Sequence, residues 1–435
     1  MRLIDQILSK ENMLDAIESV KRNKGAAGID KVTVGELDEY FRQNWSEMKT
    51  AILARKYEPQ PVRRVYIPKS NGKLRPLGIP AVADRVIQQA IAQELVRIVD
   101  SSFSKNSHGF RPQRSCHSAM DQVLQNLNDG YEWAIDLDIE KYFDTVNHDK
   151  LISILREQVN EATTLNLIRR FLKAGVMENG VFCQSSEGVP QGGPLSPILS
   201  NIYLDKLDKE LESRGLRFVR YADDVVIFVK SEMAANRVMK SVVSWLERKL
   251  FLKVSATKTK IVRPSKSEFL GFGFWKSGKD WKCRPLQNRR AKLYKKCKDI
   301  LCRKKATARP LAVTFTKLNQ VIRGWINYYR IGNMKTFLEE FGQWLRHKVR
   351  VVIIKQWKRP RTIYRNLMRL NQMFKCSMTD EDIFKVANSR RGWYRRCATN
   401  TVNYLLSPKL LETANEKRER PGLINPLNYY LEELQ

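Results

Sequence analysis

One segment constrains this chain more than any other. Residues 218–229 are apolar along almost their whole length, yet they carry adjacent carboxylates at Asp223 and Asp224. The pattern predicts a β-hairpin with Ala222, Asp223 and Asp224 at its tip. Neighbouring carboxylates in an apolar hairpin repel each other and lose hydration, so a cation must compensate them. The alternative is an ordinary exposed turn, because Asp favours turns and loops.

A second acidic segment precedes this hairpin in the chain. The alternation over residues 133–139 predicts a strand with apolar side chains on one face and Asp136 and Asp138 on the other, and Asp144 follows shortly after. If this strand lies beside the hairpin, three converging carboxylates supply hard oxygen ligands for Mg²⁺. Two such ions support in-line displacement of pyrophosphate by a hydroxyl. The residues themselves leave the choice of first ligand open.

Strands and helices interleave up to about residue 275. The strand 62–67 and the Asn71-Gly72 turn signal predict a hairpin. Helices are expected at 86–99, 115–127 (with Ser115 as N-cap), 151–159 and 233–250, and 269–275 should be extended. Residues 285–357 are strongly basic with apolar positions at helical spacing, which predicts a helical domain. Residues 358–361 are expected to link it to a smaller, mostly helical module.

The charge balance indicates the kind of partner. Lys and Arg number 78 against 46 Asp and Glu, a formal net charge of +32. So large an excess implies a polyanion, and nucleic acid is the first candidate. A membrane is disfavoured because the apolar runs are far shorter than the roughly 20 residues of a spanning helix. Seven cysteines without a C-x-x-C pair argue against zinc or disulfides and favour a reducing cytosol.

Several motifs, in this order along the chain, resemble those of reverse transcriptases. Tyr221-Ala-Asp-Asp224 looks like their catalytic hairpin, and residues 135–144 look like their first acidic motif. Residues 322–330 resemble the thumb, or maturase, region of group II intron-encoded proteins. Further matches are Lys69…Arg75-Pro-Leu-Gly-Ile-Pro80, Ser107-His-Gly-Phe-Arg-Pro112, Gly188-Val-Pro-Gln-Gly-Gly-Pro-Leu-Ser-Pro197 and Phe269-Leu-Gly-Phe-Gly-Phe274. Over about residues 20–360 the chain therefore resembles a group II intron-encoded reverse transcriptase/maturase.

The resemblance implies an α+β right-hand polymerase. Residues 1–285 would form the fingers and palm, with 1–60 as an N-terminal helical extension. Residues 286–360 would form an all-helical thumb or maturase domain, and 361–435 a small, mostly helical nucleic-acid-binding domain. After His347 the chain has Cys376 and Cys397 but no histidine. We therefore expect a compact form without the metal-binding endonuclease domain that many relatives carry.

The resemblance also implies roles for single residues. Asp138, Asp223 and Asp224 are expected to hold two Mg²⁺ ions and to carry catalysis. Phe143 is expected to lie under the incoming sugar and to exclude a 2′-hydroxyl. The other expected substrate-binding residues are Lys69, Arg75, Gln191 and Lys258.

Two of these assignments contain an open choice. A two-residue Asn71-Gly72 turn would pair Lys69 with Leu74 and place Arg75 on the opposite face of the hairpin. Both cations then reach a triphosphate only if the loop has another length. Lys258 resembles a lysine that protonates pyrophosphate, but Lys260 is equally placed by its chemistry.

The expected function is RNA-directed DNA polymerisation, together with binding of the parent intron RNA to assist splicing and retrotransposition. The implied partners are that RNA, an RNA template, a DNA primer or target and deoxynucleoside triphosphates, in a cytoplasmic ribonucleoprotein. The oligomeric state is left open. Charge runs are usually solvated faces, but a net charge of +32 makes that role improbable for all of them. The candidate nucleic-acid-binding residues are Lys24, Arg63, Arg111, Arg114, Arg289, Arg290, Lys295 and Lys296.

Three other functions compete with this interpretation. One is a non-enzymatic RNA-binding splicing cofactor on a polymerase-like fold, which the intact acidic motifs oppose. Another is a reverse transcriptase of a different lineage, serving phage defence or a CRISPR system, which the maturase-like segment opposes. The third is an RNA-dependent RNA polymerase, which Phe143 opposes because its ring would exclude ribonucleotides.

Overall fold

A computed structural model describes residues 2–68, 72, 74–413 and 420–433. The chain divides into two compact units, Met1–Ser267 and Glu268–Gln435, each mixing helices with a sheet. Mixed helix and sheet is the composition predicted from the sequence. The strands within residues 268–285 belong to the second unit. The expected domain boundaries lie instead at 285 and 360, and they stay predictions of where the functional domains divide. Among the described residues, no helix is both long and apolar enough to cross a bilayer.

The first unit contains two four-stranded sheets, ordered β2-β1-β4-β5 and β6-β7-β3-β8. The strands are β1 Val62–Pro68, β2 Leu74–Ile79, β3 Trp133–Asp138, β4 Val176–Glu178, β5 Val181–Cys183, β6 Arg217–Tyr221, β7 Asp224–Val229 and β8 Lys260–Val262. The α-helices are α1 Leu3–Ile7, α2 Lys10–Arg22, α3 Leu37–Leu53, α4 Val82–Val99, α5 Cys116–Asn128, α6 Tyr142–Thr145, α7 His148–Arg156, α8 Ala162–Lys173, α9 Ser196–Ser213 and α10 Glu232–Trp245.

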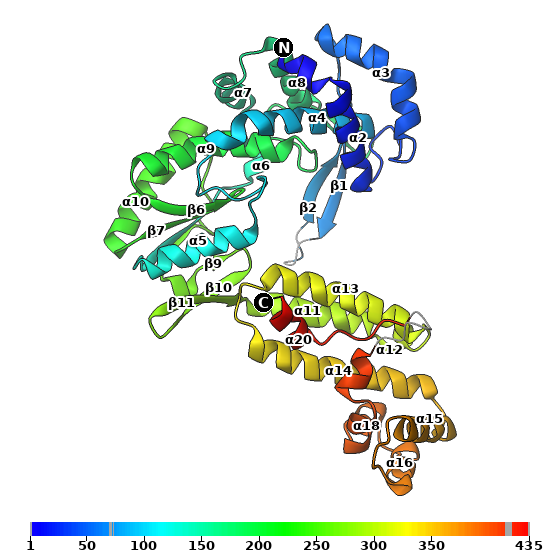
Figure 1. Cartoon of the computed structure of the whole chain (residues 1–435). Coiled ribbons are helices and arrows are strands. Elements are labelled where there is room, and N and C mark those ends of the chain that lie inside the picture. Colours follow the sequence, from blue (N-terminus) through cyan, green and yellow to red (C-terminus); the bar gives the residue numbers. More distant parts are fainter. Residues whose placement is uncertain (1, 69–71, 73, 414–419, 434–435) are drawn as a thin grey trace. The chain divides into compact units, whose positions relative to one another are not determined.

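The sheet that carries the acidic motifs has β3 as a central strand, because β7 and β8 both pair with it antiparallel. Helices α5 and α9 pack against β6, and α10 packs against β3 and β7 (Figure 1). Ile135 and Leu137 of β3 and Val225–Val229 of β7 are buried, as the apolar pattern predicted. This core holds the two acidic strand ends in a defined register.

All four expected helices form, but several of their ends differ from the prediction; α4, expected from 86, already begins at Val82. Ser115 caps α5 through a capping box with Ser118, as predicted. The helix expected at 151–159 begins earlier, because the Asn147 side chain caps α7 by accepting from the Lys150 backbone N–H. The helix expected at 233–250 is α-helical to Trp245 and ends in a π-helical turn, Leu246–Leu250.

The hairpin of β1 and β2 forms with a register different from the expected one. Pro68 pairs with Leu74 and Ile67 with Arg75, one residue away from the Lys69–Leu74 pairing that a two-residue turn requires. Of the two alternatives, this register excludes a two-residue turn and fits a loop of another length. Lys69 itself lies outside the described residues, so its expected role stays a prediction.

The second unit is mostly helical. Its strands are β9 Glu268–Phe269, β10 Phe272–Ser277 and β11 Asp280–Pro285, and they form one sheet, ordered β11-β10-β9. The α-helices are α11 Gln287–Ile300, α12 Arg303–Ala306, α13 Leu311–Tyr329, α14 Lys335–Trp357, α15 Pro360–Met373, α16 Asp380–Ala387, α17 Trp393–Arg396, α18 Asn400–Leu405, α19 Pro408–Glu412 and α20 Pro426–Glu432.

Two expectations for this unit are modified by the structure. The extended segment expected at 269–275 is split, because Leu270 and Gly271 both adopt positive φ between β9 and β10. The expected linker 358–361 is only a short break, since α15 already begins at Pro360.

Candidate active site

Three carboxylates meet where β3 ends and β7 begins. Asp138 is the last residue of β3 and pairs directly with Asp224, the first residue of β7. Asp223 immediately precedes it and, with Ala222, forms the two-residue turn between β6 and β7. Side chains directly opposite on antiparallel strands have Cβ atoms about 4.5–5.5 Å apart. Residues far apart in the sequence thus share one end of the sheet.

The site carries more negative charge than its own cations balance. Burial raises the pKa of Asp224 to about 6, and the Asp223 and Asp138 carboxylates add to that rise. Burial also raises the pKa of Asp223, while the Arg75 guanidinium opposes the shift. Both rises come first from desolvation of the charged carboxylates and then from their mutual repulsion. A bound cation would offset both effects.

Lys258 contacts one of these carboxylates directly. Its ammonium donates to both oxygens of Asp138, with Nζ–Oδ1 and Nζ–Oδ2 distances of 3.0 and 2.9 Å. The same loop supports Asp138 through its backbone, because the Ser255 N–H donates to the Asp138 carbonyl at 2.8 Å. Lys260 lies 3.7 Å from Asp136 instead. The structure thus distinguishes two lysines that the sequence left equivalent.

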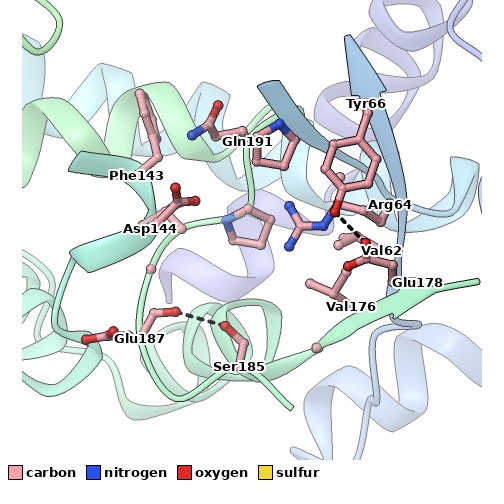
Figure 2. Close-up of a pocket in the computed structure, with 16 residues that line it drawn as sticks. Val62, Arg64, Tyr66, Phe143, Asp144, Val176, Glu178, Ser185, Glu187 and Gln191 are labelled. Atoms are coloured by element: carbon pink, nitrogen blue, oxygen red, sulfur yellow. Dashed lines mark hydrogen bonds between the residues drawn. The ribbon is translucent and has the colours of Figure 1, made fainter. Parts of the chain in front are cut away.

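Asp136 and Asp144 occupy other surroundings. The Ser267 hydroxyl donates to Asp136 Oδ1 at 2.6 Å, and Lys260 pairs with the other oxygen. Asp144 lies on α6 and lines a neighbouring cavity (Figure 2). Among the three candidates for the first ligand, only Asp138 pairs across the sheet with Asp224.

The donor set suits a divalent cation, although the described residues contain no group of three or more His, Cys, Asp or Glu side chains gathered as ligands. In this structure both oxygens of Asp138 accept from the Lys258 ammonium. Carboxylate oxygens are the ligands that Mg²⁺ prefers. Asp138, Asp223 and Asp224 would hold the metal once Lys258 releases Asp138.

The loop before α9 is held tightly against β2. The Gly78 N–H donates to the Gln191 carbonyl at 2.8 Å. Gly192 has φ +124°, and a Cβ there would lie 2.4 Å from the Gly78 carbonyl oxygen. This close approach requires glycine. The loop position places the Gln191 side chain beside Arg75, whose Nε donates to Gln191 Oε1 at 2.9 Å.

A cavity of about 350 Å³ lies between this loop, α6 and the sheet of β1 and β4 (Figure 2). Phe143 and Gln191 line it, together with Arg64 and Glu178. Phe143 is half-buried and makes an edge contact with Tyr142, with ring centroids 5.2 Å apart. Its ring therefore both packs on the core and faces open space. The expected contact of Phe143 with the incoming sugar stays a prediction.

The candidate nucleic-acid-binding residues of the first unit differ in exposure. Lys24 is exposed and Arg114 is half-buried. Arg63 donates to the Ala27 carbonyl at 2.8 Å and so secures the preceding loop. Arg111 is 7 % exposed at its side chain, pairs with Asp100 and donates to three backbone carbonyls. Because these contacts occupy its guanidinium, we assign Arg111 a structural role and leave it out of the proposed nucleic-acid surface.

The candidates of the second unit all lie on α11. Lys295 and Lys296 are exposed. Arg290 lies over the Phe337 ring, 4.9 Å from its centroid, and burial lowers the pKa of its guanidinium. Arg289 is half-buried beside Gly271. The two lysines are therefore the candidates on α11 that are open to a phosphate backbone.

Sequence reasoning missed a buried group directly behind the acidic turn. The group consists of Arg220, Asp208 and Asn201, each 0 % exposed. Arg220 donates hydrogen bonds to both of the others. The available signal was Arg220 itself, a charged residue within the otherwise apolar stretch 218–222. Such a residue is rarely buried without a specific partner.

Two family models match the chain. Residues 67–274 match the model described as reverse transcriptase (RNA-dependent DNA polymerase). Residues 290–371 match the model described as group II intron, maturase-specific domain. The first match contains all three carboxylates, and the second contains most of α11 and all of α13 and α14.

Similar proteins include intron-encoded ones. Protein YkfC of Escherichia coli is 36 % identical over 300 residues, which cover 60 % of this chain and 79 % of YkfC. Group II intron-encoded protein LtrA of Lactococcus lactis subsp. cremoris is 38 % identical over 223 residues, 50 % of this chain and 36 % of LtrA. The putative COX1/OXI3 intron 2 protein of Saccharomyces cerevisiae is 35 % identical over 206 residues, 46 % of this chain and 24 % of that protein. The chain thus spans most of YkfC but only about a third of LtrA.

The chain is also similar, to a lesser degree, to solved structures. A partial Cas6-RT-Cas1–Cas2 complex contains a chain that is 25 % identical to this one. The likeness covers 57 % of this chain and 43 % of that chain, at a TM-score of 0.38.

Proposed function

The chain belongs to the family of group II intron-encoded reverse transcriptase/maturases and carries its RNA-dependent DNA polymerase domain, and we propose that Asp138, Asp223 and Asp224 form the catalytic centre of that polymerase. In this proposal residues 1–285 act as fingers and palm and 286–360 as thumb. Residues 361–435 bind nucleic acid. The chain copies RNA into DNA and binds its parent intron RNA to assist splicing and retrotransposition.

The observation that carries the proposal is the direct pairing of Asp138 with Asp224 at one end of the sheet. Two Mg²⁺ ions at these carboxylates would activate a primer 3′-hydroxyl and stabilise the leaving pyrophosphate. The three side chains would hold the ions, and the surrounding apolar core fixes the ends of the strands that carry these side chains. Lys258, released from Asp138, is then free to donate a proton to the leaving group.

The remaining substrate contacts follow from the neighbouring loop. Arg75 and Gln191 are already joined by a hydrogen bond, so the guanidinium is oriented before substrate arrives. A guanidinium suits a triphosphate because it offers several charge-assisted donors. Phe143, on α6, would face the sugar and reject a 2′-hydroxyl by its bulk.

Binding of intron RNA is proposed mainly for the basic second unit. Lys295 and Lys296 are exposed on α11, and both lie within the segment that matches the maturase model. Contacts to phosphates release counterions, so affinity should fall steeply with salt. A nearly flat log–log plot of RNA affinity against salt concentration would exclude this mode of binding.

Primer extension on an RNA template, with and without Mg²⁺, tests the catalytic proposal. We expect the double variant Asp223→Asn, Asp224→Asn to lose DNA synthesis and to retain RNA binding. Asp136→Asn is the matched control, because Asp136 lies on the same strand but contacts Ser267 and Lys260. Unchanged synthesis by the double variant would remove the catalytic assignment. Absence of synthesis in the unmodified protein, with tight RNA binding, would favour a non-enzymatic splicing cofactor.

A further inference from the structure

A buried arginine lies directly behind the acidic turn. Arg220 is the second-last residue of β6, two positions before Ala222, and is 0 % exposed. Its guanidinium donates to Asp208 through Nε and Nη2, with the Nη2–Oδ2 distance 2.6 Å. Asp208, on α9, is also 0 % exposed. A fully buried bidentate pair of this kind fixes both side chains in one geometry.

The same guanidinium reaches the backbone of the turn. Arg220 Nη1 donates to the Ala222 carbonyl at 3.0 Å. Ala222 has φ +58°, a conformation that residues with a Cβ rarely adopt. Backbone strain of this kind persists only where the surroundings impose it, and it gathers at functional sites. The contact from Arg220 is one such imposed restraint.

A second group connects the turn to a neighbouring loop. Asn201 accepts from Arg220 Nη1 at 2.9 Å and donates to the Gly109 carbonyl at 2.8 Å. A Cβ at Gly109 would lie 2.3 Å from the Ala222 backbone nitrogen, so this loop touches the turn. The backbone of Arg220 also pairs with the loop, since the His108 N–H donates to its carbonyl at 2.9 Å.

We propose that Arg220, fixed by Asp208 and Asn201, is a positioning residue that holds the Ala222–Asp223 turn in the conformation required for metal binding. The inference rests on the proposed function, because it concerns the same carboxylates. The pair suits this task because Asp208 balances the charge of Arg220. The guanidinium can then hold the turn without adding net positive charge beside the metal site. A lysine cannot replace it, because one ammonium cannot reproduce the planar fork of donors.

The central test is Arg220→Lys. We expect amide hydrogen exchange in residues 222–225 to accelerate at least about tenfold, because the turn loses its restraint. We also expect Mn²⁺ affinity, measured by electron paramagnetic resonance without substrate, to fall at least about fivefold. In primer extension, kcat should fall about tenfold or more, with KM for the nucleotide changed less than about twofold.

Arg350→Lys is the matched control. Arg350 is a 7 % exposed arginine of the second unit that also donates to a side-chain amide, Asn403, and a carbonyl, Leu406. Its substitution should leave exchange in residues 222–225 and Mn²⁺ affinity unchanged. An equal change in both variants would mean that Arg220 acts only on general stability and would overturn the proposal.

A second variant covers the case in which Arg220→Lys does not fold. Arg220→Met with Asp208→Leu replaces the buried pair by apolar side chains of similar size, which proteins often tolerate. The folded double variant should show the same faster exchange and weaker Mn²⁺ binding. Normal values of both would refute the positioning role. Hydrogen exchange reports on the turn even if Asp223→Asn, Asp224→Asn leaves DNA synthesis intact, so the two proposals fail separately.

Discussion

Arg75 and Gln191 are joined by a 2.9 Å hydrogen bond from Nε to Oε1, which connects β2 to the loop before α9. The two residues come from separate motifs of the sequence. Their contact means that the cation proposed for the triphosphate and the amide proposed for the nucleotide act as one unit.

This contact predicts non-additive substitutions. Arg75→Ala and Gln191→Ala should each lower kcat/KM for the nucleotide, because each removes a substrate contact and loosens the other residue. The double variant should lose less than the product of the single effects, with a coupling energy of about 0.5–3 kcal/mol. Single-turnover primer extension over a range of nucleotide concentrations measures all three variants. Strictly multiplicative losses would show that the two residues act independently.

Lys258 and the metal are expected to compete for Asp138. Lys258→Ala removes the ammonium that occupies both Asp138 oxygens, so Mn²⁺ should bind more tightly. The rate of DNA synthesis at saturating metal should nevertheless fall, because the proposed proton donor to the leaving group is lost. Lys260→Ala is the control, since Lys260 lies beside Asp136. Weaker Mn²⁺ binding in Lys258→Ala would contradict this arrangement.

Phe143→Ala should relax the choice of sugar. The half-buried ring lines the cavity beside the loop of Gln191, and its removal opens space for a 2′-hydroxyl. We expect the preference for deoxyribonucleotides to fall about 10–200-fold, the range for a steric difference of this size. Competitive incorporation of dNTP and rNTP measures the ratio. Phe182→Ala, an exposed aromatic on β5, should leave it unchanged, and a constant ratio in Phe143→Ala would rule out the gate.

The stability of the first unit should depend on pH through Asp84. This side chain is 2 % exposed, accepts from the Tyr57 hydroxyl at 2.6 Å, and burial raises its pKa to about 6. A carboxyl whose pKa is higher in the folded state stabilises the fold at low pH, and that contribution disappears as the pH rises through about 6. From pH 4 to pH 8 the loss amounts to up to about 3 kcal/mol, at 1.36 kcal/mol per pKa unit.

Asp84→Asn removes the titration and keeps a polar group of the same size. Urea unfolding at pH 4, 6 and 8 should show the variant gaining stability relative to the unmodified chain as the pH rises. A difference between the two proteins that does not change with pH would exclude Asp84 as the titrating group.

Much of the site was predictable because its signals are local. The alternation around Asp138 and the apolar flanks of Asp223 and Asp224 predicted the strand and the hairpin, and both form. Lys258 and Lys260 could not be distinguished, because their contacts depend on how β8 and the preceding loop pair with β3. Arg111 was assigned to nucleic acid from its charge, but its internal contacts depend on the fold of its loop.

The amino-acid order alone determined which segments become strands and helices, and it marked the acidic residues as out of place in apolar surroundings. Those properties arise from neighbours within a few positions, such as side-chain alternation and helix caps. Strand register and burial are set by contacts between distant segments, so only the tertiary structure paired Asp138 with Asp224 and gave Arg75 a partner in Gln191. The same long-range packing enclosed Arg220 with Asp208, because a buried charge acquires its partner only when the core closes around it.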